Sequence, residues 1–205
     1  MAVADAAVAW LDAIVTGARS ASLPELLAVA FGLAYIGLAI RQHRACWIAG
    51  GVSTAIYVAV FLKAGLPLQA ALQLVYVALS FYGWLAWRPG GDALVRPRHL
   101  PLRWQTQALL AVLLLTAVST ALLASYTDAE APLADSLGTW ASVFATWLLA
   151  RRYLETWFWW MVIDAGLAGL FASQGLAFTA ALYVAYSLLA IAGWRAWRHT
   201  MVTSA

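Results

Sequence analysis

Seven long apolar segments, separated by short polar connections, most restrict how this 205-residue chain can fold. A typical soluble domain is about half apolar and about a quarter charged. Here 64% of the residues are hydrophobic and 10% are charged, so a water-soluble domain of this length has no place for the apolar surface. The sequence therefore predicts an all-α integral membrane protein. We expect seven transmembrane helices near 25–40, 47–63, 68–87, 105–125, 137–150, 157–173 and 177–197.

The basic residues of the connections fall almost entirely on one side of such a bundle. With seven spans, that side receives the connections at 41–46, 88–104 and 151–156 and the C-terminus, which together hold ten arginines. The opposite side holds Arg19 and Lys63. Because basic loops stay in the cytoplasm, this count predicts a cytoplasmic C-terminus and an N-terminus outside. The basic residues do not gather in one patch, so we expect no nucleic-acid partner.

The chain also contains an internal repeat. Shifted by 110 residues, 47–88 aligns with 157–198 without a gap, and sixteen of the 42 positions are identical, among them paired tryptophans, glycines and tyrosines. Arg41 falls on Arg151, so the repeat includes the preceding helix. Two three-helix units joined by the helix at 105–125 keep the same orientation in the membrane. Parallel repeats of this kind occur in transporters, whose substrates bind near the midplane between the repeats.

These observations divide the chain into five parts. The first eighteen residues lack the basic start of a secretory signal, and their apolar residues share one side of a helix, so we expect an amphipathic interfacial helix there. The expected parts are an N-terminal interfacial segment (1–23), a first three-helix repeat (24–88), a basic loop with the linker helix (89–126), a second three-helix repeat (127–198) and a C-terminal tail (199–205).

The most specific candidate site lies in the stretch 151–164. On a helix, Trp157, Trp160 and Asp164 are three and four positions apart, so they share one face. Two indole walls and a carboxylate at membrane depth suit a flat ligand that is cationic or forms hydrogen bonds. The alternative is a purely structural Asp164, paired with a neighbouring helix or protonated in place. Glu155 is expected to form an ion pair with the arginines beside it.

Stripes of polar and aromatic residues on the third and seventh segments extend this candidate site. Polar side chains at bilayer depth face the bundle interior or a cavity. The alternative is interhelical hydrogen bonding together with an aromatic belt at the interface, and we prefer this alternative for the four tryptophans, Trp84, Trp87, Trp194 and Trp197. We expect cavity lining for the deeper residues, which are Gln73, Tyr76, Ser80, Tyr183 and Tyr186. The full stripes are Gln69, Gln73, Tyr76, Ser80, Trp84 and Trp87, and Thr179, Tyr183, Tyr186, Trp194 and Trp197.

No enzyme signature is present in the sequence. It has no phosphate-binding glycine loop, no Gly-x-Ser-x-Gly elbow and no ATPase element. The single Cys46 and three histidines in arginine-rich connections do not fit a metal site. We therefore expect a protein that is not an enzyme and uses neither a cofactor nor a metal.

Two of these regions resemble a known family. The motifs Gln69-x3-Gln73 leading to Tyr82-Gly83-Trp84-Leu-Ala-Trp87, and Arg152-Tyr153-x-Glu155-x-Trp157-x2-Trp160-x3-Asp164 followed by Gln174-Gly175, resemble the PnuC nicotinamide riboside transporters. The resemblance implies a SWEET-like fold of three plus one plus three helices in the bacterial inner (plasma) membrane. It also implies facilitated diffusion of a vitamin precursor, trapping by cytoplasmic phosphorylation, and homotrimers.

The resemblance leaves the substrate open. Nicotinamide riboside is a pyridinium cation, which suits indole faces and Asp164. In that family asparagine is common at the position of Asp164, and thiamine, which is also cationic and aromatic, is the second candidate. A proton-coupled transporter would use Asp164 as its carrier, whereas a non-transporting membrane assembly protein has no need for polar residues at the midplane. The expected partners are a small-molecule vitamin and the lipid bilayer.

Overall fold

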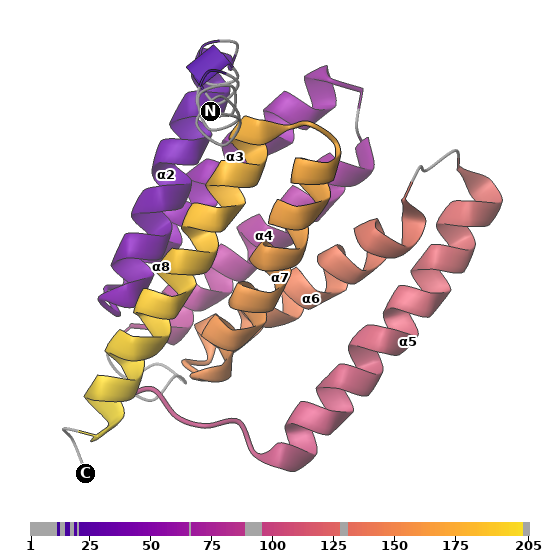
Figure 1. The fold of residues 1–205 in the computed structure, drawn as a ribbon. Helices are drawn as coiled ribbons and strands as arrows, with labels where there is room; N and C mark the ends of the chain where they lie inside the picture. Colours follow the sequence, from indigo (N-terminus) through magenta and orange to yellow (C-terminus); the bar gives the residue numbers. More distant parts are fainter. Residues whose placement is uncertain are drawn as a thin grey trace, which may run out of the picture.

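The computed structural model describes residues 12, 15, 16, 19, 21–65, 67–88, 96–127 and 131–202. Within these ranges the fold is all-helical, as the sequence predicts (Figure 1). The expected N-terminal interfacial helix lies largely outside the described residues. The helices are α2 (Leu23–Ile40), α3 (Cys46–Lys63), α4 (Pro67–Ala86), α5 (Leu102–Tyr126), α6 (Pro132–Ala150), α7 (Glu155–Ser173) and α8 (Ala177–Val202).

Length and composition make five of the described helices suitable to cross a membrane, namely α2, α3, α4, α5 and α8. The two others, α6 and α7, carry the buried polar residues Ser142, Thr146 and Asp164. The boundary predicted for α6 was wrong, because the helix begins at Pro132 and not near 137. Proline in the first turn and Asp135 just after it both favour a helix N-terminus, so the acidic connection is shorter than predicted.

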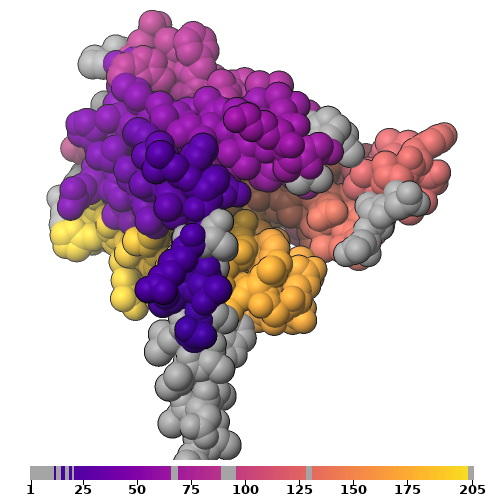
Figure 2. All heavy atoms as spheres, turned by 90° about the horizontal axis from the view of Figure 1, so that it is seen from above, coloured from indigo at the N-terminus to yellow at the C-terminus, as the bar shows by residue number. Residues whose placement is uncertain are grey.

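Six of the described helices close into a ring. Contacts run from α2 to α3, α4, α6, α7 and α8 in that order, and α8 returns to α2. The fifth helix, α5, packs along α6 outside this ring (Figure 1). Figure 2, which views the molecule from the end where α2 begins, shows the neighbouring ends of α5 and α6 at the margin of the molecule. The ring is the part of the fold that encloses the candidate site.

Backbone conformations recur at the 110-residue interval of the sequence repeat. Gln42 and Arg152, which follow α2 and α6, both have φ of 56°, and Gly65 and Gly175, which follow α3 and α7, have φ of 73° and 75°. Glycine adopts this left-handed region readily, but Gln42 and Arg152 pay a conformational cost there. We call α2, α3 and α4 the first triplet and α6, α7 and α8 the second. The two triplets turn in the same way at matching positions, and α2 and α6 run in the same direction (Figure 1).

At the end of the ring where α2 finishes, two tryptophans pack against glycines. A Cβ atom added to Gly83 would overlap the Trp47 indole, and one added to Gly193 would overlap the Trp157 indole. Trp47 is 2% exposed and Trp157 is 3% exposed. The pairs occupy equivalent positions of the repeat, so each triplet draws its second and third helices together by one indole on one glycine.

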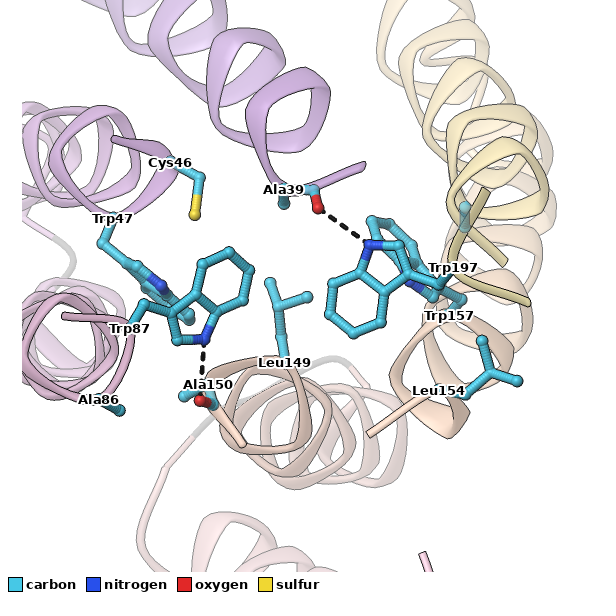
Figure 3. Close-up of a cluster of buried hydrophobic side chains, with 11 residues drawn as sticks. Ala39, Cys46, Trp47, Ala86, Trp87, Leu149, Ala150, Leu154, Trp157 and Trp197 are labelled. Atoms are coloured by element: carbon cyan, nitrogen blue, oxygen red, sulfur yellow. Dashed lines mark hydrogen bonds between the residues drawn. The ribbon is translucent and has the colours of Figure 1, made fainter. Parts of the chain in front are cut away.

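Two further tryptophans join one triplet to the other. Trp87 at the end of α4 donates its indole N–H to the Ala150 carbonyl at the end of α6, over 3.0 Å. Trp197 in α8 donates to the Ala39 carbonyl at the end of α2, over 3.1 Å (Figure 3). Both tryptophans bond between helices, as the preferred structural interpretation predicts, but they are buried and do not form an exposed aromatic belt. They instead seal this end of the ring.

Arginines at the same end stack on the remaining tryptophans of the stripes. The Arg44 guanidinium lies 3.5 Å from the Trp84 ring centroid, and its Nε donates to the Trp84 carbonyl over 2.8 Å. Arg198 lies 5.0 Å from the Trp194 ring centroid. Such cation–π contacts hold long basic side chains against the helix ends. Basic and aromatic residues therefore form one packed layer at this end.

The basic loop before α5 is attached to the start of α7. A parallel backbone bridge joins Arg98 to Tyr153, and the Glu155 carboxylate accepts the Leu100 N–H over 3.0 Å. The same carboxylate lies 2.9 Å from His99 Nδ1. Glu155 thus binds the loop rather than serving only the arginines beside it, which sequence spacing alone did not predict. The loop becomes a further cover on the sealed end.

The tryptophan–glycine packing gives a stability prediction. Replacing Gly193 by alanine places a methyl group inside the Trp157 ring, and overpacking of this kind costs about 1–3 kcal/mol. Gly193→Ala should therefore lower the melting temperature of the detergent-solubilised protein. Gly166→Ala in α7 is the matched control, because its Cβ meets no atom within 4 Å. Equal melting temperatures for the two variants would contradict the packing.

Candidate functional site

The ring encloses a cavity of about 790 Å³, to which all six of its helices contribute side chains. Small-molecule sites in proteins are about 300–1,000 Å³ in volume, so the cavity has the size of a ligand site. Its wall combines aromatic rings with hydroxyl, amide and carboxylate groups. The polar residues of the stripes therefore face inward, and lipid-facing positions such as Phe81 and Phe158 are apolar and exposed.

The cavity opens at one end of the ring only, as far as the described residues show. Exposed lining residues mark its mouth: Gln69 at the start of α4, Asp135 at the start of α6 and Gln174 after α7. Its floor lies against Tyr35 and Trp160, which pack on the tryptophan cluster at the opposite end. The cavity is therefore accessible from the end of the bundle opposite to the C-terminus.

Seven of the eight residues predicted for the site line this cavity. Trp157 does not: it lies in the sealed end, with its ring 5.4 Å from that of Trp197 at an interplanar angle of 87°. Trp157 is thus not on the wall of the main cavity, because Gly193 opens a slot for its ring, and it meets Trp160 and Asp164 only at a smaller void of about 70 Å³. The seven lining residues are Gln73, Tyr76, Ser80, Trp160, Asp164, Tyr183 and Tyr186.

Asp164 is the acid held deepest in the cavity wall. It lies in the middle of α7, is 4% exposed, and stands one helical turn from Trp160. Tyr183 and Tyr186 of α8 line the same cavity. An acid that shares a cavity with an indole and two phenols offers a ligand a hydrogen-bonding group, charged when ionised, and several aromatic faces.

The tyrosines of α8 form a packed aromatic wall beside Asp164. The Tyr183 ring stacks on Phe171 of α7 at 5.3 Å and meets the Tyr186 ring edge-on at 5.8 Å. A Cβ atom added to Gly32 of α2 would lie 3.7 Å from the Tyr186 hydroxyl, so this hydroxyl reaches the neighbouring triplet. Packing of this kind fixes ring positions before a ligand arrives.

The two triplets contribute different chemistry at equivalent positions. At the 110-residue interval of the repeat, Asp164 corresponds to Thr54, Tyr183 to Gln73 and Trp160 to Gly50. All of these residues line the cavity. At these three positions the first triplet therefore has small or neutral hydrogen-bonding residues, and the second has the acid and two aromatic rings.

Several lining residues were not predicted as site residues. Asp135 had been assigned to a loop, although Pro132 and the acid three positions later are typical of a helix start. Thr54 could have been found as the repeat counterpart of Asp164. Ser142 and Thr146, four residues apart on α6, line the cavity, and the Thr146 hydroxyl donates to the Ser142 carbonyl over 2.8 Å. Their spacing was the only available signal.

The described lining of the cavity contains no lysine, arginine or histidine. Its ionisable side chains, apart from tyrosines, are Asp135 and Asp164. Within the described part of the chain, no group of three histidine, cysteine, aspartate or glutamate residues is placed to hold a metal ion. The cavity therefore attracts a neutral or cationic ligand and repels an anionic one.

Comparison with known proteins decides the family. The family model described as nicotinamide mononucleotide transporter matches residues 22–199. The chain belongs to this family. The match covers α2 to α7 completely and α8 except for its last three residues. It therefore includes every described residue that lines the cavity.

Individual relatives agree with the family. The nicotinamide riboside transporter PnuC of Escherichia coli is 25% identical over 208 residues, covering 88% of this chain and 87% of the relative. The riboflavin/roseoflavin transporter RibM of Streptomyces davaonensis is 27% identical over 172 residues, covering 81% and 80%. The two relatives are thus named for different vitamins.

A solved structure shows the same fold. The crystal structure of the vitamin B3 transporter PnuC matches with a TM-score of 0.74 at 21% identity, covering 97% of this chain and 92% of that chain. This agreement establishes the fold. The chain is thus a helical membrane protein of the nicotinamide mononucleotide transporter family.

The single buried cysteine makes the cavity testable by labelling. Thr139→Cys places a thiol on the cavity wall, whereas Leu114→Cys places one on the exposed apolar face of α5. Thiolates react only where water reaches them, so a membrane-impermeant maleimide should label Thr139→Cys and leave Leu114→Cys unlabelled in membrane vesicles. The wild-type protein, with only the buried Cys46, is the background control. Labelling of both variants at one rate would contradict a water-filled cavity.

Proposed function

We propose that this protein carries nicotinamide riboside across the membrane by facilitated diffusion. The observation that supports it most directly is a cavity with Trp160 and Asp164 on its wall in a chain of a nicotinamide-compound transporter family. The pyridinium ring of the riboside is a planar cation. An indole face and a carboxylate both attract such a ring, by cation–π and charge interactions.

The charge of the cavity favours the riboside over the mononucleotide. A phosphate group is bound in proteins by arginine, lysine or helix N-termini. The described lining lacks basic side chains and contains Asp135 at the mouth and Asp164 inside. A nucleotide phosphate would meet two carboxylates and no counter-charge, so the substrate we propose carries no phosphate.

The unequal triplets suggest an orientation for the substrate. The pyridinium ring lies against Trp160 and Asp164 of the second triplet. The ribose hydroxyls face Gln73 and Thr54 of the first triplet, which offer both donors and acceptors. Each end of the riboside then meets groups of matching chemistry.

Transport follows from alternating access between the two triplets. The described state is open at the end away from the C-terminus, which the arginine distribution places outside the cell. Opening to the cytoplasm requires the bonds from Trp87 to Ala150 and from Trp197 to Ala39 to break, because they join the triplets at the sealed end. An inside-negative potential favours entry of a cation by about 2.3 kcal/mol per 100 mV. Phosphorylation in the cytoplasm then retains the product.

The same proposal includes the finer architecture. The two triplets (24–88 and 127–198) are parallel repeats of a SWEET-like fold, and the segment 89–126 links them. Matching φ angles at positions 110 residues apart support this organisation. The protein resides in the bacterial inner (plasma) membrane, with its N-terminus outside, its C-terminus in the cytoplasm, and three copies forming a homotrimer.

Two other vitamins remain candidates of the same kind. Thiamine is also a planar cation and would use Trp160 and Asp164 in the same way. Riboflavin is neutral, and the relative RibM, which is 27% identical to this chain, is named as a riboflavin transporter. Only the two cations gain from Asp164, so the carboxylate favours them over riboflavin.

Binding to the purified protein tests the proposal. Nicotinamide riboside should bind to the wild type, and nicotinamide mononucleotide should not compete. Asp164→Asn, which keeps the shape of the side chain, should weaken riboside binding about ten- to a hundredfold, as expected for loss of one charge contact of ~1.4–2.7 kcal/mol. Trp160→Ala should weaken it by a similar factor.

The matched control is Trp159→Phe, because Trp159 lies on the same helix but packs against Phe144, away from the cavity. Isothermal titration calorimetry in detergent provides the dissociation constants. Preferential binding of thiamine would move the assignment to that vitamin. Tight binding of the mononucleotide, or unchanged affinity in Asp164→Asn and Trp160→Ala, would refute the site.

A further inference from the structure

The floor of the cavity contains an aromatic residue from the first triplet. Tyr35 of α2 lines the main cavity together with Trp160. Both residues also line a smaller void of about 70 Å³, as do Asp164 and Tyr186. The four side chains therefore surround one region at the bottom of the cavity, where unfilled space remains.

The position of Tyr35 depends on a glycine of the next helix. A Cβ atom added to Gly50 of α3 would lie 2.9 Å from Tyr35 Cδ2 and 3.3 Å from Cε2. Such a distance is shorter than side-chain packing allows, so any larger residue at Gly50 pushes the Tyr35 ring away. The absence of a side chain at Gly50 is what lets the ring lie against α3.

In the second triplet, the large and the small residue of the Tyr35–Gly50 pair exchange places. At the 110-residue interval Tyr35 corresponds to Ala145, and Gly50 corresponds to Trp160. The first triplet thus has the large ring on its first helix and the small residue on its second. The second triplet has Ala145, fully buried, on its first helix and the large Trp160 ring on its second. Through this pair of positions, each triplet contributes a large aromatic side chain to the cavity floor, Tyr35 from the first and Trp160 from the second.

We propose that Tyr35 is a second aromatic contact of the substrate ring, paired with Trp160, and that Gly50 positions it. This inference rests on the proposed transport of a planar cationic vitamin. A cation between two aromatic side chains is attracted to both ring faces. Tyr35 therefore determines how well the site accepts a planar ring.

Tyr35 also connects this contact to the sealed end. Its ring lies 5.9 Å from that of Trp47, whose ring lies 5.6 Å from that of Trp87. Trp87 in turn lies 6.2 Å from Trp197, the donor of the other bond between triplets. A substrate that touches Tyr35 thus contacts the first member of the aromatic cluster that holds the triplets together. Displacing Tyr35 should change the transport rate as well as affinity.

Four variants test the inference, with affinity for nicotinamide riboside and uptake into proteoliposomes as readouts. Tyr35→Leu removes the ring but fills the space, and should weaken binding about tenfold, whereas Tyr35→Phe should bind like the wild type. Gly50→Ala should weaken binding about as much as Tyr35→Leu. Gly51→Ala is the matched control with unchanged binding, because its Cβ meets Ser80 Cβ at an ordinary 3.5 Å.

The double variant Tyr35→Leu/Gly50→Ala separates positioning from general damage. If Gly50 acts through Tyr35, Gly50→Ala should have no further effect on affinity once the ring is gone. Additive losses would show that Gly50 acts by another route and would overturn its positioning role. Wild-type affinity in Tyr35→Leu and Gly50→Ala would overturn the contact itself.

The proposed function can fail separately. If the wild type binds the riboside and Trp160→Ala weakens binding while the Tyr35 and Gly50 variants do not, only this inference is wrong. If the wild type binds neither the riboside nor thiamine, the proposed function is wrong and the inference is wrong with it. Melting temperatures of all variants identify any that are misfolded, and Gly50→Ala and Tyr35→Leu serve as independent tests of the same ring.

Discussion

Close packing of indole on glycine at one end of the ring is the contact on which the rest of the structure depends. Trp47 on Gly83 and Trp157 on Gly193 bring two helices of each triplet together, and Trp87 and Trp197 then bond across to the other triplet. In a bilayer there is no hydrophobic driving force between helices, so such van der Waals packing and hydrogen bonding must hold them. Because these contacts gather at one end, the other end is free to separate around a cavity.

The cavity shows how a repeated fold acquires a site with two unlike sides. Thr54 and Asp164 occupy equivalent positions of the repeat, as do Gly50 and Trp160. Helices at equivalent positions therefore present different side chains to the cavity. The asymmetry is local, since the tryptophans of the sealed end are identical in both triplets. The triplets thus differ at several cavity-lining positions, although Phe61 and Phe171, and Tyr76 and Tyr186, are identical pairs there.

Much of the fold could be predicted from the sequence, because apolar length, arginine placement and the 110-residue repeat each report on the whole chain. Asp164 and the stripe of α4 could be predicted as inward-facing because polar groups avoid lipid. Interhelical hydrogen bonding by Trp87 and Trp197 was predicted, but the burial of these two rings and the place of Trp157 in the sealed end could not be. A tryptophan beside an arginine reads as interfacial, and only a glycine on a neighbouring helix, distant in sequence, makes room to bury it. Tyr35 was missed for the same reason, since its place depends on Gly50.

The position of α5 outside the ring has an evolutionary consequence. Its outward face, including Leu110 and Leu114, is exposed, and its contacts are with α6 through residues such as Val112 and Ser119. A substitution on that outward face needs only an apolar side chain that is compatible with lipid, because it contacts neither the cavity nor the sealed end. Natural variation should therefore accumulate more readily along this face than among the side chains of the six helices that line the cavity.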